Sequence, residues 1–509
     1  MSSSRRCNLS GTLLLSAAAL AAAACENYWF LPFMDGGGTA GTTVGGLAAP
    51  GATFTENLIQ ERTFTHGTSV CTVTYDAADL QRIPLAVDFN RDGRLDPVVG
   101  YGDQQAVIQI LLSRPDSSDV DPISLTLDSK RDMEELADVA VGDIDGDGYL
   151  DIVAAAEAAV WYFHHPSHGD PTALRDWGAL DPNDPQRERI DASYDQVTDD
   201  ELLAIITQAI GPGVNLDDYI VTVEQLYTNV EIADCDDDGD HDVVASRSFV
   251  IDLTPRPEAP VEPIQIQDGD VMIFVNPGFA ADGNSWTQVS IGRHERQHRL
   301  DRDGAAGLLV YDMDGDGRLD VVSTAREDNN AQIAWFRNPG PPLLTENPWT
   351  QYRIGSIRDS WALDIGDVTG DGWPDVIATG AAQMQTILYE HPGIPFPNQR
   401  YEYDWETHVI TTFQSFQPHD ARLLDLDNDG ELELVVGGTN GALRWFEPGA
   451  DPTQEWAAGI ITTFAGGGDV GLLGYGDLDG DGDLDLVVTI NTLEDNSTRT
   501  VWIRNNLAD

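Results

Sequence analysis

One nine-residue pattern recurs seven times in this 509-residue chain and restricts its possible folds more than any other feature. Asp stands at position one, an apolar residue at two, Gly at six and an acidic residue at nine. A single copy would be a weak signal, but seven in register indicate a repeat architecture. The copies are DFNRDGRLD from Asp88, DIDGDGYLD from Asp143, DCDDDGDHD from Asp234, DMDGDGRLD from Asp312, DVTGDGWPD from Asp367, DLDNDGELE from Asp425 and DLDGDGDLD from Asp477.

The pattern matches the first half of an EF-hand calcium loop, but the Glu expected at position twelve is absent; Ser323 stands there in the fourth copy. Ca²⁺ takes six to eight oxygen ligands, and Gly permits the sharp turn that brings them together. We expect the side chains at positions one, three and five, the carbonyl at seven and the carboxylate at nine to surround the ion. Acidic turns without metal are the alternative, which explains the Gly but not the number of carboxylates.

The cofactor prediction is therefore Ca²⁺, up to seven ions. Neutral oxygens at position three, from Asn90 and Thr369, leave the first and fifth loops with less charge. The expected ligands are Asp88, Asn90, Asp92, Arg94, Asp96, Asp143, Asp145, Asp147, Tyr149, Asp151, Asp234, Asp236, Asp238, Asp240, Asp242, Asp312, Asp314, Asp316, Arg318, Asp320, Asp367, Thr369, Asp371, Trp373, Asp375, Asp425, Asp427, Asp429, Glu431, Glu433, Asp477, Asp479, Asp481, Asp483 and Asp485.

The flanks of each loop predict strands rather than the helices of an EF-hand. A short apolar or alternating run precedes every loop, and a β-branched or Leu-rich run follows it. A third strand follows in each unit and a fourth in several, often with Trp. Four strands in each of seven units predict an all-β, seven-bladed β-propeller with calcium loops between the first and second strands of each blade. The last unit lacks a fourth strand, so we expect a strand from residues 55–75 to close the ring.

These loops resemble those of the FG-GAP or VCBS repeat family, whose calcium-loop blades also occur in the integrin α-subunit propeller. The resemblance covers roughly residues 55–509. It implies a seven-bladed propeller with Ca²⁺ in the inter-strand loops. The sequence departs from the pattern at His241 and Pro374, where position eight is otherwise Leu, and at Glu433 in position nine.

The first 54 residues read as an export and tethering segment. Arg5 and Arg6 precede a short apolar run, which predicts a signal peptide over residues 1–24. Small residues before Cys25 indicate a bacterial lipoprotein, with ordinary signal cleavage as the alternative. Residues 25–54 are then a flexible Gly- and Thr-rich tether. We expect an extracytoplasmic protein, on the bacterial outer membrane or cell surface if lipidated and otherwise secreted.

A helical insertion is predicted at about residues 167–225, where successive loops are farther apart than elsewhere. Thr198 and Glu201 form a capping box, and the helical run ends at Gly211. An eighth, metal-free blade in this interval is the alternative. Cys71 and Cys235 fall in different repeats, and we expect two buried thiols rather than a disulfide.

The net charge of −58 argues against nucleic-acid binding. HERQH at residues 294–298 fits the zinc-protease motif, but its flanks lack an apolar helical face, so we interpret it as accidental. A possible ligand site is formed by basic and aromatic residues of connections expected at the channel rim: Arg131, His294, His298, Arg358, Trp361 and His419. Scattered polar loop residues are the alternative.

The sequence thus predicts a monomeric, non-catalytic module that binds a protein or glycan and touches a membrane only through a lipid at Cys25. The alternative is a carbohydrate-active enzyme, similar to a lyase or dehydratase, that uses the channel rim. The fold cannot choose between the two, because propellers host both.

Overall fold

The computed structural model describes residues 54–63, 73–74, 88–101, 107–113, 120–126, 136–156, 159–165, 187–190, 199–211, 215–257, 261–278, 286–294, 305–325, 331–341, 348–393, 405–464, 468–492 and 497–507. Within these ranges the chain forms seven four-stranded antiparallel sheets. We number the sheets in the chain order of their acidic loops. The signal peptide and most of the tether lie outside the described residues.

Sheets 1 to 4 contain the first half of the repeats. Their strands are β2 (Val73–Thr74), β3 (Val98–Tyr101), β4 (Val107–Ser113) and β5 (Val120–Thr126); β6 (Leu136–Gly142), β7 (Asp151–Ala156), β8 (Ala159–Phe163) and β9 (Arg187–Arg189); β10 (Tyr219–Ala233), β11 (Asp242–Pro255), β12 (Ile264–Val275) and β13 (Thr287–Gly292); β14 (Ala305–Tyr311), β15 (Asp320–Ala325), β16 (Ala331–Arg337) and β17 (Thr350–Ile357).

Sheets 5 to 7 follow the same order, except that an N-terminal strand completes sheet 7. Their strands are β18 (Ser360–Gly366), β19 (Asp375–Gly380), β20 (Gln385–Glu390) and β21 (Glu406–Thr412); β22 (Pro418–Leu424), β23 (Glu433–Gly438), β24 (Ala442–Glu447) and β25 (Ala457–Thr463); β26 (Asp469–Gly476), β27 (Asp485–Thr492), β28 (Ser497–Asn505) and β1 (Phe54–Thr63).

The second strands form the buried middle of the sheets. Every residue of β7, β15, β19 and β23 is buried, which requires other layers on both faces. The outer strand β25 is exposed or half-buried at every position. This gradient explains why the runs after each acidic loop are continuously apolar, whereas the fourth strands read as mixed.

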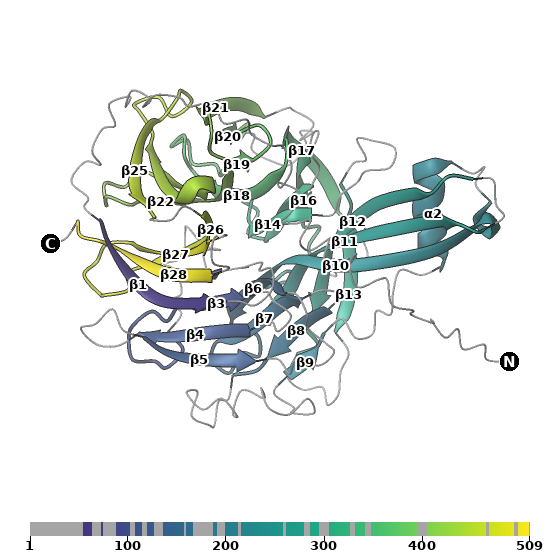
Figure 1. Ribbon diagram of the computed structural model, residues 1–509, viewed down its shortest axis with the longest axis horizontal. Helices are drawn as coiled ribbons and strands as arrows, with labels where there is room; N and C mark the ends of the chain where they lie inside the picture. The colour runs from purple at the N-terminus through teal and green to yellow at the C-terminus, as the bar shows by residue number, and fades with distance from the viewer. Residues whose placement is uncertain are drawn as a thin grey trace.

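Apolar clusters join each sheet to the next. One cluster packs Val310 of sheet 4 with Val271 of sheet 3, and others link sheets 4 and 5, 5 and 6, and 6 and 7. A further cluster packs Trp502 of sheet 7 with Ile108 of sheet 1 and Ile152 of sheet 2. The first strands also touch in order, and β26 contacts β2. The chain is therefore an all-β β-propeller, with first strands near the centre and β5, β9, β21 and β25 at the periphery (Figure 1).

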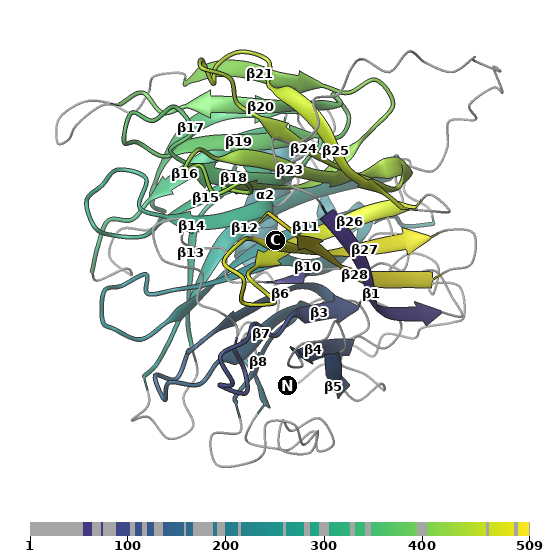
Figure 2. The same cartoon turned by 90° about the vertical axis from the view of Figure 1, so that its left-hand side faces the viewer.

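The N-terminal strand takes the outer position of the last sheet, as predicted. β1 pairs antiparallel with β28, so that Phe54 lies opposite Asn505 and Thr63 opposite Ser497. Figure 2 shows β1 beside β28. The strand that begins the described chain thereby covers the edge that sheet 7 would otherwise expose.

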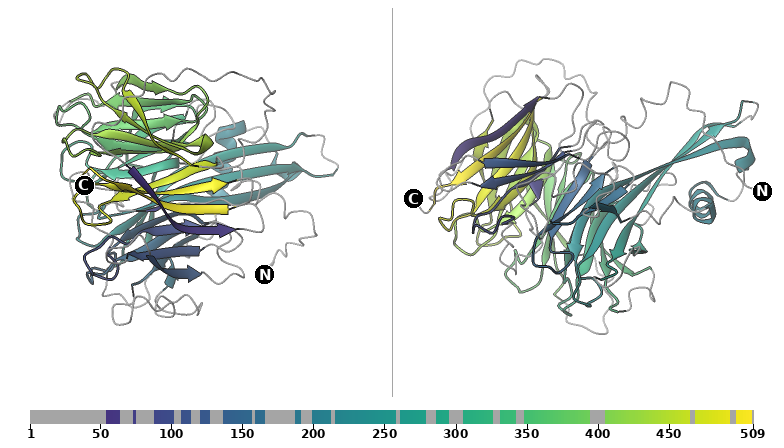
Figure 3. Two further views of the ribbon diagram at one scale, coloured as in Figure 1. Left: turned by 60° about the vertical axis from the view of Figure 1, so that its left-hand side comes forward. Right: turned by 90° about the horizontal axis from the view of Figure 1, so that it is seen from below.

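Sheet 3 extends beyond the other sheets as an arm. β10 and β11 pair from Ala233 opposite Asp242 out to Tyr219 opposite Pro255, and β12 accompanies them. The helix α2 (Asp199–Ile210) packs Ile205 against the apolar face of these strands. Figure 3 shows the arm and α2 projecting away from the remaining sheets. Repeat spacing alone did not predict the arm.

The interval predicted as a helical insertion is more varied than expected. The helix itself is confirmed within one residue of its expected end at Gly211. The same interval also holds β9, the outer strand of sheet 2, and the start of β10. No eighth sheet occurs among the residues that the structure describes. In the same ranges, none of the helices combines the length and apolarity needed to cross a bilayer.

Cys235 carries a free, buried thiol, in agreement with the prediction, whereas Cys71 lies outside the described ranges. Burial raises the pKa of the Cys235 thiol well above its usual value, and the acidic side chains around it act in the same direction. The residue therefore serves as the apolar position two of its loop.

Candidate metal centre

Each acidic loop connects the first and second strands of its sheet, and one hydrogen-bond pattern closes all seven. The Gly N–H at position six donates to the position-one carboxylate over 2.6–3.1 Å. These glycines have φ between 85° and 95°, a conformation that side chains with a Cβ rarely adopt. The Gly at position six is thus required by the turn itself.

The carboxylate at position nine is a buried anchor. It is at most 1% exposed in all seven loops. One oxygen accepts the N–H of position two, as from Cys235 to Asp242 at 3.0 Å. In six loops its other oxygen accepts an N–H at the end of the third strand, as from Asn276 to Asp242 at 2.8 Å. Position nine therefore fixes the loop to its own sheet, a role that the sequence did not indicate.

Burial of this carboxylate carries an electrostatic cost. Burial raises the pKa of Asp242 and of Glu433 to about 8, and neighbouring carboxylates of the same loop act in the same direction. The pKa of Asp151 rises to about 7 for the same reason. A cation beside these groups would remove the cost by stabilising their ionised form.

Carboxylates of the loops converge as a cation site requires. Oxygens of positions one, three and nine lie within 4.8 Å of one another in the second, third and sixth loops, as do those of one, three and five in the fourth. Four buried carboxylate oxygens at positions one and three have no hydrogen-bond partner among the described residues: Asp143 Oδ1, Asp236 Oδ1, Asp427 Oδ1 and, in the seventh loop, Asp479 Oδ1. Unsatisfied buried oxygens beside like charges are the donor set that Ca²⁺ selects, so the residues fit the ion.

Arginine reaches into two of the loops from the end of the third strand. Arg337 Nη2 lies 2.7 Å from Asp316, and its Nε contacts Asp314 in the fourth loop. Arg504 contacts Asp479 and Asp481 of the seventh loop in the same way. These guanidinium groups neutralise part of the negative charge of the fourth and seventh loops, as a bound metal ion would.

The equivalent position differs in two other sheets. His164 Nδ1 lies 3.8 Å from Asp145 of the second loop. In sheet 6 the position is Glu447, whose pKa is raised by burial and then by Asp427 and Asp429. The sixth loop therefore faces an additional carboxylate where the fourth loop faces a cation.

Asparagine side chains tie neighbouring loops together. Asn276 Nδ2 donates to the carbonyl of Ile144 at 2.9 Å, and Asn338 Nδ2 donates to that of Cys235 at 2.7 Å. Asn505 Nδ2 makes the same bond to Leu426. Each link joins one sheet to position two of the preceding loop. The signal was visible as Asn at the end of the third strand or directly after it, but its target on the adjacent sheet was not.

Two of the three departures from the loop pattern, His241 and Glu433, have local explanations, whereas Pro374 has none in the structure. His241 at position eight places Nδ1 2.6 Å from the carbonyl of Asp143 and so bridges the second and third loops. Glu433 at position nine accepts the N–H of Leu426 at 2.7 Å, the bond that Asp makes elsewhere. Neither residue disrupts its loop.

The predicted rim residues are not shown as one cluster. Arg131, His298 and the side chain of Trp361 lie outside the described residues. His294 is 2% exposed, with Nε2 3.1 Å from Ser323 Oγ and its ring against Phe336. Arg358 is exposed at the start of sheet 5. His419 lies on β22, where burial lowers its pKa despite the nearby carboxylates of Asp469 and Asp420.

A family model described as the FG-GAP-like repeat matches residues 88–154, 312–378 and 425–488. These segments contain the first, second, fourth, fifth, sixth and seventh acidic loops in full. No curated protein matches the chain. The chain therefore contains FG-GAP-like repeats, and its sheets form a β-propeller.

Solved structures align with this chain at low TM-scores and low sequence identity. The "Structure of Dos1 propeller" aligns with a TM-score of 0.41 and 9% identity over 88% of this chain and 95% of that one. The Chaetomium thermophilum Sqt1 bound to the N-terminus of the ribosomal protein L10 gives 0.41 and 10% over 80% of each chain. "Apo ctPRC2 in an autoinhibited state" gives 0.38 and 10% over 77% and 71%. No function is inferred from these structures.

Proposed function

We propose that the chain is a seven-bladed propeller in which each acidic loop holds one Ca²⁺ that stabilises its hairpin. The observation that carries this proposal is the set of buried, unsatisfied loop oxygens at positions one and three, such as Asp236 Oδ1 and Asp427 Oδ1. They lie among carboxylates whose ionisation burial opposes. When bound, Ca²⁺ supplies the positive charge that lets these carboxylates stay ionised.

Elemental analysis of the purified mature chain, dialysed against calcium and then against metal-free buffer, tests the calcium proposal. We expect several and up to seven Ca²⁺ per chain. A variant with Asp427→Asn and Asp425→Asn should bind one ion fewer, because it removes positions one and three of a single loop. Absence of bound calcium from the intact chain would overturn the proposal.

We further propose that the propeller is a non-catalytic, monomeric binding module for a protein or glycan outside the cytoplasm. In this proposal a lipid at Cys25 holds the folded body near a bacterial membrane. The closed ring supports this binding role. In the proposal calcium rigidifies the seven acidic loops, while the other connections between strands stay available to bind a ligand. The acidic surface makes nucleic acid a poor partner.

The enzyme alternative depends on the channel rim, where the buried His294 offers little surface to a substrate. A glycan array probed with the calcium-loaded chain identifies ligands, and the same glycans are then tested for turnover. Glycan binding by the wild type without turnover of the bound glycan supports the binding module. Turnover by the wild type that a His419→Ala, His298→Ala variant loses, while it keeps its fold, would favour the enzyme.

A further inference from the structure

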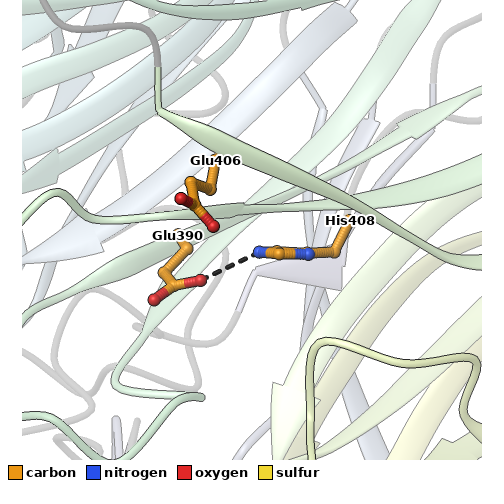
Figure 4. Close-up of side chains that lie close together, drawn as sticks. All are labelled: Glu390, Glu406 and His408. Carbon is orange, nitrogen blue, oxygen red and sulfur yellow. Dashed lines mark hydrogen bonds and ion pairs between the residues drawn. The ribbon is translucent and has the colours of Figure 1, made fainter.

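A mixed set of metal-ligating side chains lies on the two outer strands of sheet 5 and includes no residue of the acidic loops. Glu390 is the last residue of β20, and Glu406 is the first residue of β21. His408 follows two residues later and therefore faces the same side of the sheet as Glu406. Figure 4 shows the three side chains directed toward one another.

The donor atoms of this cluster are close enough to share one ion. One oxygen or nitrogen from each of Glu390, Glu406 and His408 lies within 4.8 Å of the others. His408 Nε2 lies 2.9 Å from Glu390 Oε2. The His408 side chain is 18% exposed and that of Glu390 is 31% exposed, so an ion can enter from solvent.

The strand register places two like charges directly opposite each other. Glu390 pairs with Glu406, and Leu388 pairs with His408. Facing carboxylates on paired strands destabilise a sheet, and the chain already carries a net charge of −58. A cation shared by the two carboxylates would turn this repulsion into a link between β20 and the edge strand β21.

The same register positions in neighbouring sheets do not assemble such a set. In sheet 6 they hold Glu447, Ala457 and Gly459. In sheet 4 they hold Arg337, Thr350 and Tyr352. The cluster is therefore not a by-product of the repeat, which would place comparable side chains in each sheet.

The histidine determines the kind of ion. Ca²⁺ and Mg²⁺ prefer oxygen ligands, whereas imidazole nitrogen with carboxylate oxygen suits Zn²⁺ and related transition metals. We propose that Glu390, Glu406 and His408 bind one Zn²⁺ through two carboxylates and His408 Nε2, with water as the fourth ligand. This site shares no ligand with the calcium loops.

Zinc binding to the full chain tests the proposal directly. Millimolar Ca²⁺ is present throughout to occupy the acidic loops, and ZnCl₂ is the only added ligand. Isothermal titration should show one Zn²⁺ site, and His408→Ala and Glu390→Gln should each weaken it at least tenfold. Glu447→Gln is the matched control, because it removes an equivalent Glu from sheet 6, and it should bind Zn²⁺ like the wild type.

Cobalt provides a second readout. Co²⁺ in place of Zn²⁺ should give visible absorption bands that Zn²⁺ displaces and that His408→Ala lacks. Folding of each variant is checked by its circular dichroism and by its calcium content. Zinc binding that is unchanged in both His408→Ala and Glu390→Gln, or absent from the wild type, would overturn the proposal. Absence of calcium from the loops of the wild type would instead contradict the proposed function. The zinc result would still be interpretable, because zinc binding is measured separately.

Discussion

Replacement of Arg337 by Gln separates the role of a built-in cation from that of calcium. Arg337 contacts Asp314, whose side chain is fully buried, and Asp316, while its own side chain is 27% exposed. Hydrogen bonds to charged groups contribute about 1.5–3 kcal/mol each, and partial exposure reduces this value. Without calcium, Arg337→Gln should therefore lower the free energy of unfolding by about 1–2 kcal/mol.

The same substitution should strengthen calcium binding in the fourth loop. A guanidinium near a divalent ion repels it by several kcal/mol at an effective dielectric constant of about 20, unless the side chain moves away. Removal of the guanidinium should tighten this site at least tenfold, or about 1.4 kcal/mol. The increase in stability from calcium-free to calcium-saturated buffer should then be larger in the variant than in the wild type.

Differential scanning calorimetry in EGTA and in a series of calcium concentrations measures both effects. Arg353→Gln is the control, because Arg353 lies in the same sheet and bonds Ser356 rather than a loop carboxylate. It should change neither the calcium-free stability nor the calcium increment appreciably. An unchanged or smaller increment in Arg337→Gln would show that the guanidinium does not compete with the ion.

Three further predictions concern packing, pH and metal removal. Gly459→Ala should cost about 1–3 kcal/mol in chemical denaturation, because its Cβ would lie 1.8 Å from Trp445 Nε1, whereas Gly449→Ala meets nothing within 4 Å and should be neutral. Burial raises the pKa of Asp364 to about 6, so the folded state binds the extra proton and stability should fall as pH rises from about 4 to about 6. In saturating calcium Asp364→Asn should lose this pH dependence. Parallel curves of stability against pH for the variant and the wild type would contradict the prediction. Excess EGTA should lower the melting temperature of the wild type, since calcium at 100 times its Kd contributes about 2.7 kcal/mol per site, and an unchanged temperature would argue against loop-bound metal.

The sequence was most informative where a residue's role is local. Gly317 and its counterparts are required by the turn, and an Asp at position one accepts the N–H of the same turn. Such interactions span only a few residues, so a nine-residue pattern contains them. The alternation of strands and loops follows from the same short-range information, and the propeller could be inferred from its repetition.

Features that depend on tertiary register could not be read from the pattern. Arg337 lies 23 residues from Asp314, and only the pairing of β15 with β16 brings the guanidinium to the loop. His294 looked like an exposed connection residue, yet it packs against Phe336. The arm was missed because β11 runs for 14 residues, whereas the second strands of the other sheets run for four to eight, and nothing in the repeat indicates this difference.

The pairing of β1 with β28 has a consequence for how the chain folds. Thr55 pairs with Arg504, so a strand that precedes all seven repeats has no partner until the third strand of the seventh repeat is synthesised. Contacts between such remote segments are entropically costly to form and slow folding. Until β28 is synthesised, the nascent propeller carries an open seam, which closes only when β1 and β28 pair.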